Sequence, residues 1–156
     1  MPVAGSEHRF IVVDVGNPHA ITFEAYDDAA VDRIGPIAAT LPPGGTNVEF
    51  CVARPDRISV VVWERGVGRT LACGTGACAV AFAACETGRA AYGAPIRVAL
   101  PGGELAITVA PVHEGASPAT QAGSQASGTP PSPPRAQRIL MRGPARRVFS
   151  GEVTVA

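Results

Sequence analysis

The chain has 156 residues, of which 46% are hydrophobic and 17% charged, as is typical of one soluble globular domain. Thirteen basic residues balance thirteen acidic ones, so the net charge gives no electrostatic case for a nucleic-acid partner. The sequence contains no lysine, which excludes both the Schiff base that anchors pyridoxal phosphate and the lysine of a phosphate-binding P-loop.

Two strands and a corner are predicted near the N-terminus. Residues 1–9 are expected to be a flexible lead-in, followed by a β-branched, mostly apolar strand over residues 10–15. A turn follows, in which the next proline biases Asn17 toward an extended conformation, and a second strand is expected over residues 20–24. Asn17 and His19 therefore lie at a strand corner, where an ordinary turn and a structural histidine are the simpler interpretation.

A helix and a strand are predicted next. Residues 28–40 have helical spacing, although Gly35-Pro36 makes the second half doubtful because a proline inside a helix costs about 3 kcal/mol. Residues 46–53 alternate in the manner of a half-buried strand, with Asn47 at its entrance and Glu49 on the face away from the apolar residues.

A turn containing Glu64 and Arg65 follows the strand predicted over residues 58–64, and the chain then returns toward Cys73. The pair is either a surface ion pair, which contributes little, or a carboxylate-binding site, since the planar arginine side chain fits a carboxylate with two hydrogen bonds. Its closeness to Cys73 in the sequence favours the second interpretation.

Cys73 lies between a predicted strand end and the glycine-rich start of a predicted helix. Gly74 and Gly76 allow a sharp turn and a close approach of backbone to ligand, and Thr75 is expected to cap the helix. The partial positive charge at a helix start favours a thiolate at Cys73 and holds a carboxylate or phosphate. A buried cysteine in an ordinary tight turn is the alternative.

The helix expected over residues 75–88 has no charged residue before Glu86, which predicts that other structure encloses it. Cys78 and Cys85 are interpreted as core packing. Strands are predicted over residues 96–100 and 104–109, and two more near the C-terminus, over residues 138–144 and 147–153. Between them, residues 112–137 are rich in Ala, Ser, Gly and Pro, and we expect a disordered excursion there.

The sequence also predicts the compartment and the cofactor requirement. The four cysteines lack the paired spacing of a zinc site, so no metal is expected. No apolar run approaches the roughly 20 residues that span a bilayer, and no export signal is visible at the N-terminus. We therefore expect reduced thiols in the cytoplasm, with no membrane partner.

Several separated segments, in the same order, resemble one family. They are Gly16–His19, Gly45–Phe50, Glu64–Gly66, Ala72–Ala77, Leu100–Leu105 and the C-terminal stretch from Gly143 to Glu152. Each is weak alone, but their order and co-occurrence make the chain similar to diaminopimelate epimerase over most of residues 10–155. Related cofactor-free racemases and phenazine-pathway isomerases resemble these motifs less.

The resemblance implies a cofactor-free isomerase that inverts one α-carbon of L,L-diaminopimelate, a step toward lysine and peptidoglycan. One thiolate removes the α-proton while a second thiol delivers a proton from the opposite face. The implied catalytic residues are Cys73, His19 and Glu64. The implied substrate-binding residues are Asn17, Asn47, Glu64, Arg65, Gly74 and Thr75.

The resemblance also implies the fold: an α+β domain over residues 10–156, with a mixed, mostly antiparallel sheet wrapped around the central apolar helix. The family enzyme is about twice as long, and this chain corresponds to its C-terminal half. We therefore expect a missing N-terminal half or a separate chain as partner, a possible homodimer, and no activity of this chain alone. A stand-alone domain that binds an amino-acid carboxylate and a different isomerase of the same fold are the alternatives.

Overall fold

A curved sheet forms most of the structure, a computed structural model that describes residues 2–3, 6–111, 138–147, 150–152 and 154. The strands are β1 (Pro2–Val3), β2 (Ser6–Glu7), β3 (Ile11–Asp14), β4 (Pro18–Thr22), β5 (Asn47–Ala53), β6 (Ile58–Glu64), β7 (Gly68–Thr70), β8 (Pro95–Leu100), β9 (Gly103–Val109) and β10 (Ile139–Arg142). The helices are α1 (Asp28–Ala38) and α2 (Gly74–Glu86). β1 and β2 form a separate two-stranded ribbon.

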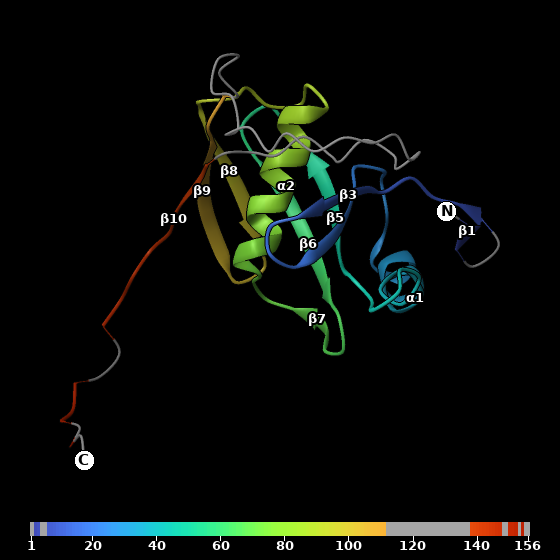
Figure 1. Ribbon diagram of the computed structural model, residues 1–156, viewed down its shortest axis with the longest axis horizontal. Coiled ribbons are helices and arrows are strands. Elements are labelled where there is room, and N and C mark those ends of the chain that lie inside the picture. The colour runs from blue at the N-terminus through green and yellow to red at the C-terminus, as the bar shows by residue number, and fades with distance from the viewer. Residues whose placement is uncertain (1, 4–5, 112–137, 148–149, 153, 155–156) are drawn as a thin grey trace, which may run out of the picture.

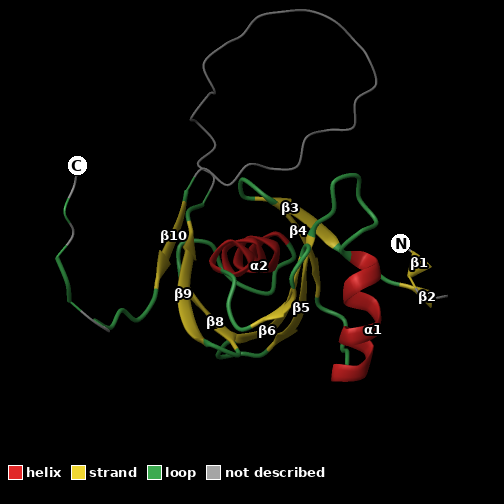
Figure 2. Cartoon of the chain, turned by 90° about the horizontal axis from the view of Figure 1, so that it is seen from below, coloured by secondary structure: helices red, strands yellow, loops and turns green. Residues whose placement is uncertain are grey.

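The eight-stranded sheet has the order β10-β9-β8-β6-β5-β4-β3, with β7 paired to β6. Among its described pairings, β4–β5 and β6–β8 are parallel and the others are antiparallel. α1 connects the first parallel pair and α2 the second (Figure 1). The sheet curls around α2, and α1 lies outside it (Figure 2). This confirms the expected α+β fold with a mixed, mostly antiparallel sheet around a central helix.

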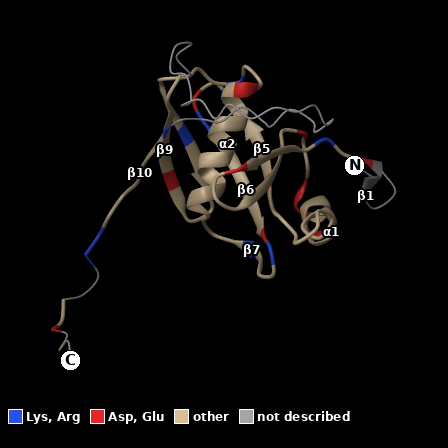
Figure 3. Ribbon diagram, in the orientation of Figure 1, with Lys and Arg blue, Asp and Glu red and all other residues tan. Residues whose placement is uncertain are grey.

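Helix α2 is enclosed because its sequence is apolar on every side. Nine of its residues are buried, among them Ala79, Val80 and Ala81 in its middle. In Figure 3 the ribbon of α2 is tan except for a red segment near its C-terminal end, the end that Glu86 forms. The helix ends at Glu86, and the N–H of Gly88 donates to the carbonyl of Cys85, as the expected glycine stop requires. The prediction of an enclosed central helix is confirmed.

Helix α1 covers the outer face of the sheet and continues through Pro36, so the predicted helix is confirmed and its doubtful second half is helical as far as Ala38. Val31, Ile34 and Ala38 form its buried stripe and pack against strand residues that include Phe50. Pro36 lies on the exposed side of the helix, which ends two residues later. The carbonyl that loses its hydrogen bond to Pro36 therefore lies on the solvent side, and the buried stripe keeps the last turn in place.

Strand β5 differs from the expected half-buried strand because helices cover both of its faces. Residues 47–51 are all buried, and Glu49 is 0% exposed. Val48 and Phe50 belong to the cluster under α1, whereas Cys51 belongs to the core around α2. The alternation of the sequence therefore separates two buried faces, and the carboxyl group of Glu49 lies in the interior.

The remaining predictions differ in detail. β4 begins at Pro18 rather than near residue 20, so His19 lies within a strand. β10 confirms the first of the two C-terminal strands, but no second strand occurs among residues 143–147, 150–152 and 154. The predicted excursion over residues 112–137 lies outside the described residues. No helix in the described part of the chain is long and apolar enough to cross a membrane.

Candidate active site

Cys73 lies at the start of α2 and is itself the N-cap of that helix. Its backbone is extended, with φ −137° and ψ 110°, and its Sγ accepts a hydrogen bond from the N–H of Gly76 at 3.3 Å. The expectation that Thr75 caps the helix is wrong, because the helix already includes Gly74 and Thr75. The N–H groups of these two residues precede the first intrahelical bonds, so they remain available for an anionic ligand.

Thr75 connects Cys73 to the corner between β3 and β4. Its Oγ1 lies 3.4 Å from Cys73 Sγ and accepts a hydrogen bond from Asn17 Nδ2 at 3.4 Å. Asn17 Oδ1 in turn lies 3.2 Å from Nε2 of His19. Four residues predicted for the site therefore form one continuous set of polar contacts, although 58 positions separate Asn17 from Thr75 in the sequence.

His19 is fully buried and contacts a carboxyl group that the sequence analysis did not include in the site. Its Nδ1 lies 2.6 Å from Oε1 of Glu49, on the neighbouring parallel strand β5. Burial raises the pKa of Glu49, an effect that the hydrogen bond with His19 partly offsets. The available signal was an acidic residue inside an apolar strand, but the alternating pattern placed it on a solvent face.

Asn47 and Arg65 form the neighbouring part of the site. Asn47 Oδ1 accepts from the backbone N–H of Arg65 at 2.9 Å, and its Nδ2 donates to the carbonyl of Pro18 at 3.5 Å. The guanidinium of Arg65 donates to the carbonyls of Gly44 and Gly45. A Cβ at Gly45 would lie 2.7 Å from Cδ of Arg65, and its φ of +74° disfavours other residues, so the loop fits closely around this arginine.

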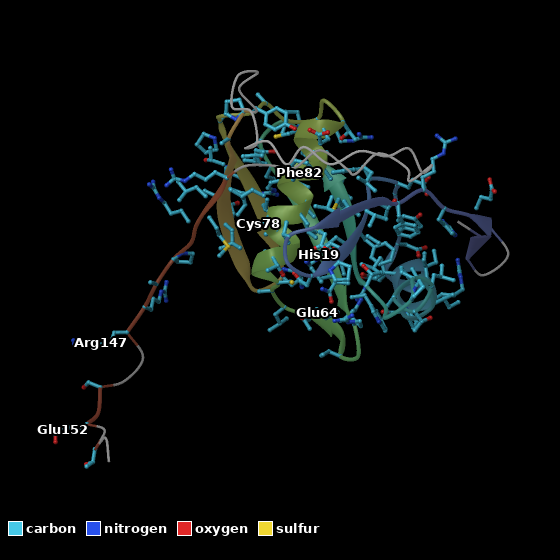
Figure 4. All side chains as sticks on the ribbon, in the orientation of Figure 1. His19, Glu64, Cys78, Phe82, Arg147 and Glu152 are labelled. Atoms are coloured by element: carbon cyan, nitrogen blue, oxygen red, sulfur yellow. The ribbon has the colours of Figure 1, made fainter. Side chains whose placement is uncertain are left out.

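Glu64 lies beside this group at the end of β6. Its Oε1 accepts a hydrogen bond from Thr70 Oγ1 at 2.6 Å, across the β6–β7 hairpin. Within the described residues, no ion pair joins Glu64 to Arg65, so the surface ion pair considered from the sequence is not formed. His19 and Glu64 both lie toward the end of the molecule where α2 begins, and Phe82 lies farther along that helix (Figure 4).

The other cysteines and the metal-binding residue types lie elsewhere or do not cluster. Cys51 and Cys85 are buried in the core, and Cys78 is half-buried and packs against it. Burial raises the pKa of the Cys51, Cys78 and Cys85 thiols. The described part of the chain contains no group of three or more His, Cys, Asp or Glu residues that could hold a metal ion.

Replacing Gly76 with alanine is expected to destabilise the domain, although this change in a helix usually stabilises by about 1 kcal/mol. A Cβ at position 76 would lie 2.7 Å from Glu49 Oε1 and 3.3 Å from Cys73 Sγ. Displacing this buried group should cost about 1–3 kcal/mol, measured by denaturant unfolding. Gly74→Ala is the matched control, because its Cβ would meet only Met141, at 3.5 Å. Equal stability of the two variants would contradict the close packing of Glu49 against α2.

The family model and the curated relatives point to one family. The sequence model described as diaminopimelate epimerase matches residues 6–124. The diaminopimelate epimerase of Desulforudis audaxviator is 41% identical over 97% of this chain and 49% of its own length. That of Sphingopyxis alaskensis is 42% identical, again over 97% of this chain and 49% of its own length. The chain therefore spans about half the length of the curated relatives it matches.

The fold is also found in a solved structure of low sequence identity. The phenazine biosynthesis protein of the PhzF family from Bacillus anthracis aligns with a TM-score of 0.51 at 21% identity. The alignment covers 68% of this chain and 36% of that protein. At this identity the likeness concerns the architecture, a sheet curled around a central helix, and not the chemistry of the site.

Proposed function

The chain belongs to the diaminopimelate epimerase family, and we propose that it carries one of the two proton-transferring thiols of such an enzyme. The observation that carries the proposal is the position of Cys73. It begins a helix whose first N–H groups are available, and polar contacts connect it to Asn17 and His19. Asn47 and Arg65 lie next to this group, and the backbone N–H of Arg65 donates a hydrogen bond to the side chain of Asn47.

In the proposed reaction, Cys73 and a second thiol lie on opposite faces of the α-carbon of diaminopimelate. One of them, as thiolate, removes the α-proton, and the other delivers a proton to the opposite face, so the configuration inverts and no proton is gained or lost overall. The α-proton is a far weaker acid than a thiol. Donors aimed at the α-carboxylate must therefore stabilise the charge that develops on it in the transition state.

The helix start can supply those donors. The N–H groups of Gly74 and Thr75 bind the α-carboxylate in this proposal, aided by the partial positive charge of the helix terminus. Asn17, Asn47 and Arg65 bind the distal amino-acid end of the substrate. His19 and Glu64 help to set the protonation of the two thiols in this proposal.

The second thiol would come from outside this chain. Cys51 and Cys85 lie in the core, where a substrate cannot reach them without unfolding. Cys78 is half-buried against that core, and burial raises the pKa of its thiol, which disfavours the thiolate that the reaction needs. Apolar side chains flank the start of α2 in the absence of a covering partner: Leu71 is 70% exposed and Met141 is 49% exposed. Both observations fit a missing half, or a separate chain, that would cover the site and complete a cytoplasmic enzyme of lysine and peptidoglycan precursor synthesis.

The proposal is tested with a chimera in which the half of the Desulforudis audaxviator relative that this chain does not match is fused to this chain. Incubation with L,L-diaminopimelate in deuterium oxide should place deuterium at the α-carbon, detected by mass spectrometry. The isolated chain should show no exchange. Exchange catalysed by the isolated chain would refute the need for a second half, whereas binding without exchange by a folded chimera would favour a carboxylate-binding domain.

Replacing Arg65 with alanine should raise the KM of the chimera for diaminopimelate about tenfold or more, because a hydrogen bond to a charged group contributes about 1.5–3 kcal/mol. Steady-state kinetics measures this change. Arg57→Ala is the matched control, since it removes the same charge at the opposite end of β6. Equal KM values for the two variants would exclude Arg65 from substrate binding.

A further inference from the structure

Glu49 is a buried carboxyl group at the site that the proposed reaction does not use. It is 0% exposed, and among the described residues its Oε2 has no hydrogen-bond partner. Retaining such a group is costly, because a buried carboxyl group loses its hydration and an unpaired oxygen gains nothing in return. Among the described residues, the polar contact of its carboxyl group is with His19, which connects it to the residues around Cys73.

Groups from four elements lie near Glu49. His19 faces it from β4, Gly76 approaches it from α2, and Cys51 lies two residues along its own strand. Glu64, at the end of β6, adds an electrostatic repulsion that favours the protonated form of Glu49.

The amide oxygen of Asn17 can only accept a hydrogen bond, so Nε2 of His19, 3.2 Å away, donates to it. One further proton then lies between Nδ1 of His19 and Oε1 of Glu49, which are 2.6 Å apart, and the two groups share it.

Nε2 of His19 is the donor to Asn17 whichever group holds the shared proton. If Glu49 holds the proton, its hydroxyl donates to Nδ1 and neutral His19 carries its hydrogen on Nε2. If His19 holds the proton, both ring nitrogens carry hydrogens. In either case Nε2–H donates to Oδ1 of Asn17, in agreement with the amide orientation in the structure.

The direction of donation then continues to the sulfur. Asn17 accepts on Oδ1, so its Nδ2 donates to Oγ1 of Thr75. With Oγ1 as acceptor from Asn17, the threonine hydrogen is free to donate to Sγ of Cys73, 3.4 Å away. An amide does not pass a proton along, so these contacts set orientation and are not a proton relay.

We infer that Glu49 is a positioning residue for Cys73, which acts through His19, Asn17 and Thr75 to direct a hydroxyl donor at the sulfur. The inference rests on the proposed function only in assigning the reacting thiol to Cys73. A donor at the sulfur favours negative charge there, which is what a thiolate base requires.

The first test is the protonation of His19 in the intact chain. Nitrogen-15 spectra of the chain labelled at its three histidines should show a hydrogen on Nε2 of His19 at neutral pH. If Nε2 instead carries no hydrogen, the hydrogen bonds from His19 through Asn17 and Thr75 to Cys73 run in the opposite direction. That result overturns the inference without any variant.

The second test is the reactivity of Cys73 toward iodoacetamide at neutral pH. Glu49→Leu should slow alkylation about tenfold, the effect of losing one hydrogen bond to a charged group. Glu49→Gln should stay close to the original rate, because its amide can still donate to Nδ1 of His19. Fragment ions in mass spectrometry distinguish alkylation at Cys73 from alkylation at Cys78 or Cys85. Unchanged alkylation in Glu49→Leu would refute the inference.

Two controls separate positioning from general destabilisation. Thr22→Val alters a buried polar residue on β4 whose hydroxyl accepts a hydrogen bond from the backbone N–H of Glu24, and Cys73 should react at its original rate in this variant. In a Thr75→Val background, Glu49→Leu should have no further effect, because the connecting hydroxyl is already absent. Additive effects of the two substitutions would overturn the inference. None of these measurements uses substrate, so they are independent of whether the chimera catalyses epimerisation.

Discussion

Replacing Ala81 with aspartate is expected to destabilise the domain severely. Ala81 is 0% exposed at the middle of α2, with buried residues on both sides of it along the helix. An ionised aspartate would lack any partner there, and a protonated one would still lack a hydrogen bond. An uncompensated buried charge costs about 3–5 kcal/mol, a large part of the roughly 5–15 kcal/mol that stabilises a domain.

Thermal unfolding followed by circular dichroism measures this effect, with a control that makes the same substitution in the other helix. Ala29 is exposed in the first turn of α1, where a negative charge is compatible with the helix dipole. Ala29→Asp should therefore change the free energy of unfolding by no more than about 0.5 kcal/mol. A melting temperature of Ala81→Asp close to that of the original chain would show that α2 is not enclosed.

The helix at the centre was predictable because its sequence leaves one solution. Thirteen residues with no charge before the last position cannot lie at a surface, and flanking strands with β-branched residues form the enclosing sheet. The candidate site was predictable for another reason: several short motifs, each weak alone, occur in an order along the chain that makes the resemblance specific.

What the sequence did not predict depends on neighbours from elsewhere in the chain. Glu49 alternates with apolar residues and so resembles the solvent side of a strand, but α2 covers that side and His19 provides a polar partner. Pro36 resembles a helix stop, yet the buried residues before and after it hold the last turn against the sheet. The alternation rule for strands assumes that one face meets solvent, but both faces of β5 are covered. The rule that proline ends a helix considers the helix alone, but packing against the sheet stabilises the last turn of α1.

The assignment of the helix cap failed for a different reason. Threonine is a common cap and cysteine is not, so residue type favoured Thr75. The extended backbone of Cys73 decides the matter, since the cap is the last residue before the helical dihedral angles begin. Cys73 therefore combines two roles that a substitution can separate, capping the helix and, in our proposal, transferring a proton.

Replacing Cys73 with serine should abolish proton transfer while preserving the fold. A serine hydroxyl can accept the hydrogen bond from the N–H of Gly76 as the thiol does, and serine is among the preferred caps. It is also a far weaker acid than a thiol, so it supplies little alkoxide to remove an α-proton. Loss of a general base typically costs 10²–10⁴-fold in rate, and we expect α-deuterium exchange by the chimera to fall by about 10³-fold.

Cys73→Ala completes the comparison, because alanine removes the thiol and the cap together. It should lower the free energy of unfolding by about 1 kcal/mol relative to Cys73→Ser, with equally little exchange. Denaturant unfolding of the isolated variants and exchange by the corresponding chimeras give the two quantities separately. A Cys73→Ser chimera that exchanges the α-proton at the original rate would remove Cys73 from the chemistry. Because serine keeps the cap, a loss of exchange in that variant without a loss of stability has a single physical explanation, the acidity of the group at position 73.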